Sequence, residues 1–173
     1  SVFLLGNTTV TWTVTDASGN TATATQVVTV NDSQAPIINA PVNITTTANA
    51  SCFATGIILG TPIISDNCSN VVVTNDAPAT FPLGTTSVTW TATDAGGNIS
   101  TAIQIITVID NTLPTITAPA SITVIADPGS CNATNVNLGV PTTADNCSIA
   151  SVINNAPSLF PPGSTTVTWT VTD

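Results

Sequence analysis

One phrase recurs three times along the chain and sets its organisation. Trp12, Trp90 and Trp169 stand in the stretches VTWTVTD, VTWTATD and VTWTVTD, and successive tryptophans are 78 and 79 residues apart. Self-similarity at a fixed period indicates an array of equal modules. Solenoid repeats are roughly 20–50 residues long. This longer period is typical of small β-sandwich domains that each fold around their own core.

The period divides the chain into three parts. We expect residues 1–31 to be the C-terminal part of one repeat, residues 32–110 to be a complete repeat, and residues 111–173 to be a third repeat without its last strand. That strand either follows in a longer molecule, which we favour, or comes from a neighbouring chain.

The composition predicts strands throughout. Hydrophobic residues make up 42% of the chain, and they are mostly Val, Ile and Ala interleaved with Thr, a mixture that favours strands over helices. Val88, Trp90 and Ala92 alternate with threonines, as in a strand with one buried face. About seven such strands, separated by turn residues, fit into the complete repeat. We therefore predict an all-β fold of antiparallel two-sheet sandwiches.

The charge balance excludes several classes of partner and activity. The chain has no Lys, Arg or His, and its formal net charge of −9 comes entirely from Asp. Nucleic acids and anionic membrane surfaces are bound through cations, so neither is expected as a partner. Catalysis would have to proceed without His, Lys, Glu or Tyr, so we expect no catalytic residue. No apolar run reaches the roughly 18 residues of a membrane-spanning helix, so no membrane insertion is expected.

Four cysteines form a repeated pair. Cys52 and Cys68 are 16 residues apart, as are Cys131 and Cys147. An even count at matched spacing predicts disulfides, since a metal site would need more ligands. Repeat symmetry favours bonds within each repeat, Cys52 to Cys68 and Cys131 to Cys147, each worth about 3 kcal/mol of stability. The rival bond, Cys68 to Cys131, would join neighbouring repeats.

The repeated motif also carries a family resemblance. The stretch FPLGTTSVTWTATDAGGN, preceded by DNCS and followed by an alternating strand, resembles the HYR (hyalin repeat) family over the whole chain. The resemblance implies immunoglobulin-like extracellular domains connected with cell adhesion, although Trp90 stands where members often have Tyr. The Thr-rich, Lys-free composition is similar to that of long bacterial HYR proteins of Bacteroidetes, including gliding-motility adhesins exported by type IX secretion.

Five aromatic residues are predicted to fill the cores of the repeats. The tryptophans share a strand face with small apolar residues, which favours a core position over a platform for stacking on a sugar ring. The phenylalanines are expected to plug one end of each sandwich. The five are Trp12, Trp90, Trp169, Phe81 and Phe160.

Several aspartates are candidate calcium ligands, because Ca²⁺ binds clustered oxygens. Asp32 and Asp110 stand at the repeat junctions, in TVNDSQAP and TVIDNTLP, which loosely resemble the calcium-binding linkers between cadherin repeats. Each junction has one carboxylate, to which Asp66 or Asp145 would add from a loop. We favour the alternative, in which these carboxylates only fix turns by accepting backbone N–H bonds. The candidates are Asp16, Asp32, Asp66, Asp94, Asp110 and Asp145.

These features predict a repeat region of a long extracellular, cell-surface fibre. Its expected role is that of a stiff, protease-resistant stalk, in which neighbouring repeats of the same chain and laterally associated copies are the partners. The absence of Lys and Arg, which leaves trypsin-like proteases no cleavage site, supports this role. The alternative is that the repeats bind a glycan or matrix ligand directly through many weak contacts.

Overall fold

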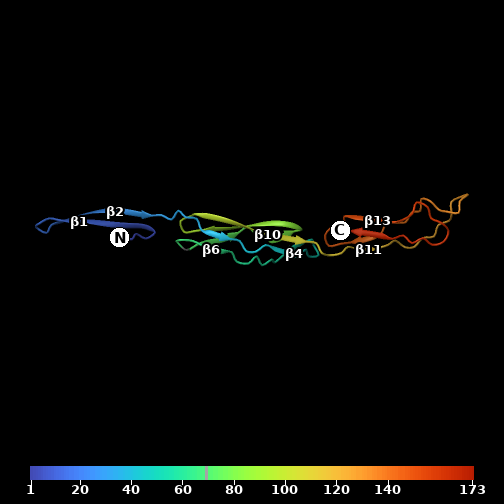
Figure 1. The fold of residues 1–173 in the computed structure, drawn as a ribbon, viewed down its shortest axis with the longest axis horizontal. Helices are drawn as coiled ribbons and strands as arrows, with labels where there is room; N and C mark the ends of the chain where they lie inside the picture. The colour runs from blue at the N-terminus through green and yellow to red at the C-terminus, as the bar shows by residue number, and fades with distance from the viewer. Residues whose placement is uncertain (69) are drawn as a thin grey trace. The chain divides into compact units, whose positions relative to one another are not determined.

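The structure is a computed structural model that describes residues 1–68 and 70–173, and these residues form strands joined by turns (Figure 1). No helix able to span a membrane occurs among them. The all-β prediction is confirmed. The strands are β1 (Gly6–Thr15), β2 (Thr21–Val30), β3 (Ile37–Asn39), β4 (Ile44–Thr47), β5 (Phe53–Thr55), β6 (Ile63–Ser65), β7 (Val72–Asn75), β8 (Thr80–Pro82), β9 (Gly84–Thr93), β10 (Ile99–Ile109), β11 (Thr115–Thr117), β12 (Thr142–Ala144), β13 (Ser151–Asn154) and β14 (Trp169–Thr172).

The complete repeat contains β3 to β10. One sheet has the strand order β4-β10-β9-β7, and two further antiparallel pairs, β3–β6 and β5–β8, accompany it. The long strands β9 and β10 form because Val, Thr, Ile and Ala alternate along both, and the turn between them contains Gly97 with a φ of 88°, a conformation that glycine adopts without strain. The short strand β8 was not among the strands predicted from the sequence.

The core of the complete repeat lies on the inner faces of these long strands. Val88, Trp90 and Ala92 of β9 are buried, as are Ile106 and Val108 of β10. Within each strand the buried residues are two positions apart, so the pleat turns them to one face of the sheet. Burial of such side chains stabilises the fold by roughly 1.5–3 kcal/mol each.

One buried residue of the core is polar. Gln104 of β10 is fully buried, and its Oε1 accepts a hydrogen bond from Trp90 Nε1 at 3.1 Å. Its Nε2 donates to the carbonyl oxygens of Val42 at 2.7 Å and Leu59 at 3.0 Å. The amide thereby ties the sheet to two segments outside it, and its buried polar atoms are all hydrogen-bonded.

The third repeat reproduces the strand pairings of the complete one. The pair β11–β12 corresponds to β3–β6, and β13–β14 corresponds to β7–β9, in the same registers. The bridge between Ala133 and Phe160 corresponds to the pairing of Ala54 with Phe81. Phe81 is buried and Phe160 is half-buried. The repeat seen in the sequence is therefore a repeat of backbone pairing.

An open groove of about 750 Å³ lies in the third repeat. Residues 118–124 and 160–167 line it, together with Trp169. These segments are the counterparts of the residues around β4 and β9, which flank β10 in the complete repeat. Among the described residues no strand takes the place of β10 here, and Trp169 is half-buried.

The first hairpin corrects one prediction. Trp12 of β1 is 63% exposed, although it was expected in a core. The strand pairs with β2 from Gly6↔Val30 to Thr15↔Thr21, and this two-stranded sheet has no further strand among the described residues. An alternating pattern buries a face only where a second layer covers it.

Two compact units are distinguished by their internal contacts. The first comprises Ser1–Ile44, Ile58–Pro78 and Ser87–Ile105, and the second comprises Thr45–Ile57, Ala79–Thr86 and Ile106–Asp173. The carboxylate clusters and the disulfide described below each lie within a single unit.

Candidate metal centre at the repeat junctions

Three aspartates that are distant in the sequence meet in the first unit. Asp32 follows β2, Asp66 follows β6 and Asp94 follows β9. One carboxylate oxygen of each lies within 4.8 Å of the others. We call these three residues the first carboxylate cluster.

A tight turn positions Asp94. Its Oδ1 accepts a hydrogen bond from the backbone N–H of Asn98 at 2.8 Å, and its Oδ2 accepts one from Asn98 Nδ2 at 2.8 Å. The same Nδ2 reaches the carbonyl oxygen of Asp32 at 3.3 Å. A Cβ added at Gly96 would lie 3.2 Å from that carbonyl oxygen, so the glycine allows the turn to approach the junction closely. Asp94 is 6% exposed.

The carboxylates of Asp32 and Asp66 are each held by a hydrogen bond from the backbone N–H two residues later in the chain. Asp32 Oδ1 accepts a hydrogen bond from the backbone N–H of Gln34 at 3.0 Å, and Asp66 Oδ2 accepts one from that of Cys68 at 2.9 Å. The second oxygens, Asp32 Oδ2 and Asp66 Oδ1, are buried and have no hydrogen-bond partner. An unpartnered buried carboxylate oxygen is costly unless another charge or donor satisfies it.

No positively charged side chain is available to neutralise this cluster. The sequence contains no Lys, Arg or His. The backbone N–H of Gln34, and next the thiol of Cys68, lower the pKa of Asp32 below its ordinary value of 3.8, so this group is ionised at neutral pH. Hard divalent cations prefer carboxylate oxygens, so these three side chains are candidate ligands for a cation from solution.

A second carboxylate cluster repeats the first in the second unit. Asp110, Asp145 and Asp173 have carboxylate oxygens within 4.8 Å of one another. Asp110 Oδ1 accepts from the backbone N–H of Thr112 at 3.0 Å, and Asp145 Oδ2 from that of Cys147 at 2.8 Å. Asp145 Oδ1 is buried without a partner, like its counterpart Asp66 Oδ1. The site is therefore a property of the repeat.

The clusters correct the expectation of a single junction carboxylate assisted by one loop. Three carboxylates meet in each cluster, and Asp173 was missed as a candidate. It lies 79 residues after Asp94, the same spacing that relates Asp66 to Asp145. The repeat period alone was a sufficient signal for it.

Asp16 does not join either cluster. Its Oδ1 accepts from the backbone N–H groups of Ser18 at 2.9 Å and Asn20 at 2.8 Å, and its Oδ2 accepts from Asn20 Nδ2 at 2.9 Å. These bonds, with that of the Asn20 side chain first, lower the pKa of Asp16. Its turn has the same side-chain hydrogen bonds to an Asn four residues later as that of Asp94, but Asp16 belongs to no group of three carboxylates among the described residues.

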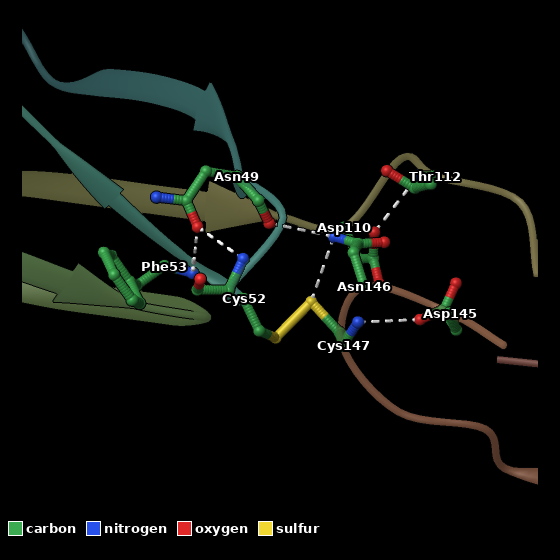
Figure 2. Close-up of a disulfide and its surroundings, with 9 residues drawn as sticks. Asn49, Cys52, Phe53, Asp110, Thr112, Asp145, Asn146 and Cys147 are labelled. Carbon is green, nitrogen blue, oxygen red and sulfur yellow. Dashed lines mark hydrogen bonds between the residues drawn. A yellow bond between two sulfur atoms is a disulfide. The ribbon is translucent and has the colours of Figure 1, made fainter.

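A disulfide joins Cys52 to Cys147, with a Cα–Cα distance of 4.7 Å. Figure 2 shows Cys52 at the end of the turn that leads into β5, opposite the loop that carries Asp145 and Asn146. The predicted bonds within each repeat, Cys52 to Cys68 and Cys131 to Cys147, are therefore wrong, and the rival bond of Cys68 to Cys131 does not form either.

The reason lies in how the two loops meet. Asn146 Nδ2 donates to the carbonyl oxygen of Asn49 at 3.2 Å, which draws the loop of the third repeat onto the turn before β5 (Figure 2). The Asn49 side chain shapes that turn by accepting from the backbone N–H of Ser51 at 2.8 Å. Cys52 is thus bonded to the next repeat, and Cys68 of its own repeat is free.

Among the described residues, Cys68 and Cys131 are free thiols. Cys68 lies beside the first carboxylate cluster, and its pKa is raised above the ordinary 9.0. The hydrogen bond to Asp32 is the largest cause, followed by burial and by the charges of the cluster. A thiol with a raised pKa is less nucleophilic at neutral pH.

Comparison with known proteins assigns the domain type. The sequence profile of the HYR domain family matches residues 31–108. This part of the chain is a HYR domain. The predicted resemblance is confirmed, and the first carboxylate cluster and Cys52 lie within the matched residues.

The curated relatives are much longer than this chain. Hyalin of Strongylocentrotus purpuratus is 35% identical over 182 residues, which cover 97% of this chain and 15% of that protein. Hyalin of Lytechinus variegatus is 32% identical over 188 residues, which cover 99% of this chain and 34% of that protein. The Sushi, von Willebrand factor type A, EGF and pentraxin domain-containing protein 1 of Rattus norvegicus is 32% identical over 169 residues. These residues cover 90% of this chain and 4% of that protein.

Proposed function

We propose that this chain is a non-catalytic stretch of a long extracellular, cell-surface adhesion protein, in which HYR repeats act as a stiff stalk. The observation that carries the proposal is the bond from Cys52 to Cys147, which joins one repeat covalently to the next. Disulfides persist in oxidising, extracellular surroundings. The similarity to hyalins over nearly the whole chain supports an adhesion-type role.

We further propose that each carboxylate cluster binds a calcium ion that stiffens the repeat junction. Ca²⁺ takes six to eight oxygen ligands at about 2.3–2.6 Å. Three carboxylates, with Asp32 Oδ2 and Asp66 Oδ1 buried and unpartnered, supply the anionic part of such a shell. In the second cluster the Asn146 Oδ1 atom, also buried and unpartnered, is a further oxygen next to Asp145.

Thermal unfolding with and without calcium tests this site. The chain is freed of metal with EGTA, and its midpoint is measured as CaCl₂ or MgCl₂ is added. Calcium at about one hundred times its dissociation constant adds roughly 2.7 kcal/mol to the free energy of unfolding, so the midpoint is expected to rise. An unchanged midpoint at millimolar calcium refutes the calcium site.

Two matched variants assign the effect to the clusters. Asp94→Asn removes a carboxylate from the first cluster, whereas Asp16→Asn alters the same kind of turn outside both clusters. The calcium response is expected to shrink in Asp94→Asn and to persist in Asp16→Asn. Equal responses in the two variants would place calcium binding elsewhere.

The stalk role competes with direct binding of a glycan or matrix ligand. In the complete repeat the aromatic side chains Phe81 and Trp90 are buried, so they offer no stacking surface. We expect a chain with Trp12→Ala, which removes the exposed tryptophan of β1, to show no binding to matrix polysaccharides or to the cell surface. Saturable binding of this chain in a pull-down or by surface plasmon resonance would favour direct recognition instead.

A narrower proposal concerns the kind of surface protein. The absence of Lys and Arg and the many threonines support a bacterial surface adhesin of the gliding-motility type, exported by type IX secretion. Deletion of this repeat region in the producing cell is then expected to shorten the surface filament and slow gliding. Normal filaments and normal gliding in that deletion strain would contradict the assignment.

A further inference from the structure

Each of the two described repeats contains one bonded and one free cysteine. In the complete repeat the early cysteine, Cys52, is bonded, and the late one, Cys68, is free. In the third repeat the late cysteine, Cys147, is bonded, and the early one, Cys131, is free. The bond therefore runs from the early cysteine of one repeat to the late cysteine of the next.

The surroundings of Cys68 match those of Cys147. The backbone N–H of Cys68 donates to Asp66 Oδ2 at 2.9 Å, and that of Cys147 donates to Asp145 Oδ2 at 2.8 Å. The side chain of the preceding Asn contacts the sulfur in both, at 3.2 Å for Cys68 and 3.5 Å for Cys147. The loop that presents the bonded sulfur in the third repeat is thus present in the complete repeat.

The turn before Cys131 is closed by the same kind of hydrogen bond as the turn before Cys52. The backbone N–H of Asn49 donates to the carbonyl oxygen of Phe53 at 2.8 Å. In the third repeat the N–H of Asp127 donates to the carbonyl oxygen of Asn132 at 2.8 Å. The one-residue insertion of ADPGSC relative to ANASC is accommodated within this turn. The closing hydrogen bond is therefore repeated, although the backbone at the cysteine differs, since Cys52 has a φ of 64° and Cys131 has no positive φ.

From this double match we propose that Cys68 and Cys131 are half-sites of the same junction staple, and that the partner of each is a cysteine of a further HYR repeat. Cys68 takes the early cysteine of a preceding repeat, and Cys131 takes the late cysteine of a following repeat. This inference rests on the proposed repeat array, and it makes every junction of that array covalent.

The chemistry of the bond is ordinary thiol oxidation. Two thiols lose two protons and two electrons as the S–S bond forms, and a small-molecule or protein disulfide accepts them and becomes two thiols. The thiolate is the form of each cysteine that reacts in this exchange.

A tandem insertion within the full chain tests the proposal. A second copy of residues 32–110 is placed between residues 110 and 111, which adds one early and one late cysteine. Free thiols are then counted in the oxidised, denatured protein. The original chain has two, Cys68 and Cys131. The longer chain is also expected to have two, because the added pair completes one new junction.

Two single substitutions in the longer chain fix the direction of the bond. Cys68→Ser in the first copy is expected to leave both disulfides intact, with one free thiol. Cys68→Ser in the second copy is expected to lose a disulfide and to leave three free thiols. Equal thiol counts in the two variants would show pairing within repeats and overturn the proposal.

Disulfide mapping of the full-length protein from its source answers the same question without an insertion. The peptide containing Cys68 is expected to be linked to a peptide of another repeat. A free Cys68 or a link to Cys52 would refute the staple, while a calcium response of the melting midpoint would be unaffected. The failure of this inference is therefore distinguishable from the failure of the proposed calcium site.

Discussion

The hairpins β1–β2 and β9–β10 have similar sequences and the same hydrogen bond between a Trp and a Gln side chain, yet they differ in burial. Trp12 Nε1 donates to Gln26 Oε1 at 3.2 Å, and Trp90 Nε1 donates to Gln104 Oε1 at 3.1 Å. Trp12 is 63% exposed, whereas Trp90 is 6% exposed. The hairpin register fixes the bond between the side chains, and burial depends on segments elsewhere in the chain.

Gln104 shows how those segments attach. Its Nε2 donates to the carbonyl oxygens of Val42 and Leu59. Gln26 stands at the corresponding place in β2, and no such bonds form among the described residues. The Trp–Gln pair is thus a preformed element that stabilises the fold only when the rest of the repeat covers it.

The sharpest contrast between the hairpins is expected for the tryptophans. Trp90→Ala removes a buried side chain and is expected to lower the free energy of unfolding by about 3–5 kcal/mol. Trp12→Ala changes an exposed residue and is expected to cost about 0.5 kcal/mol or less. Urea unfolding followed by circular dichroism measures both. Similar losses would show that the first hairpin is also covered in solution.

A smaller contrast is expected for the glutamines. Gln104→Ala leaves the Trp90 N–H and the carbonyl oxygens of Val42 and Leu59 without their partner. Each such group costs roughly 1–3 kcal/mol, so we expect a loss of about 3 kcal/mol, against at most about 0.5 kcal/mol for Gln26→Ala. An equally mild effect at both positions would mean that water replaces the buried amide.

The smallest effect is the pH dependence of stability that arises from Asp16, which follows β1, and Asp32, which follows β2. The pKa values of Asp16 and Asp32 are lowered in the folded protein. Their contribution to stability is therefore complete above the ordinary pKa of 3.8 and is lost as pH falls through the lower folded values. The melting midpoint is therefore expected to fall as the pH drops below about 4.

Substitutions show which aspartate causes the loss of stability at low pH. Asp16→Asn removes the titrating group of the first turn, so its midpoint is expected to depend less on pH than that of the unmodified chain. Asp76→Asn is the control, because it removes one carboxylate that lies in neither cluster. An identical pH profile for all three proteins would rule out Asp16 as a contributor.

The sequence predicted those features that depend on local pattern. Alternation in residues 85–94 identified the strand and the buried face of Trp90, and the period identified the corresponding pairings of the third repeat. It did not predict the role of Gln104, because a glutamine in an alternating strand gives no sign of the carbonyl oxygens it will meet.

The cysteines show a different limit of sequence reasoning. In a periodic chain, a bond within a repeat and a bond to the next repeat have the same symmetry. Only the contact of Asn146 with the turn at Asn49 selects the second. The carboxylate clusters lie between these cases. The period identifies Asp173 as the counterpart of Asp94, but it does not show that the strand ends bring three carboxylates together.

The bond between Cys52 and Cys147 also decides how a pulled chain carries tension. The two sulfurs are 95 residues apart in sequence, so a force applied to the chain ends passes through the S–S bond and bypasses everything between them. The bypassed residues, including β9, β10 and the core around Trp90, hold on the order of 300 Å of extended chain. The applied force does not extend this length while the disulfide is intact. Reduction of the disulfide makes the whole length extensible.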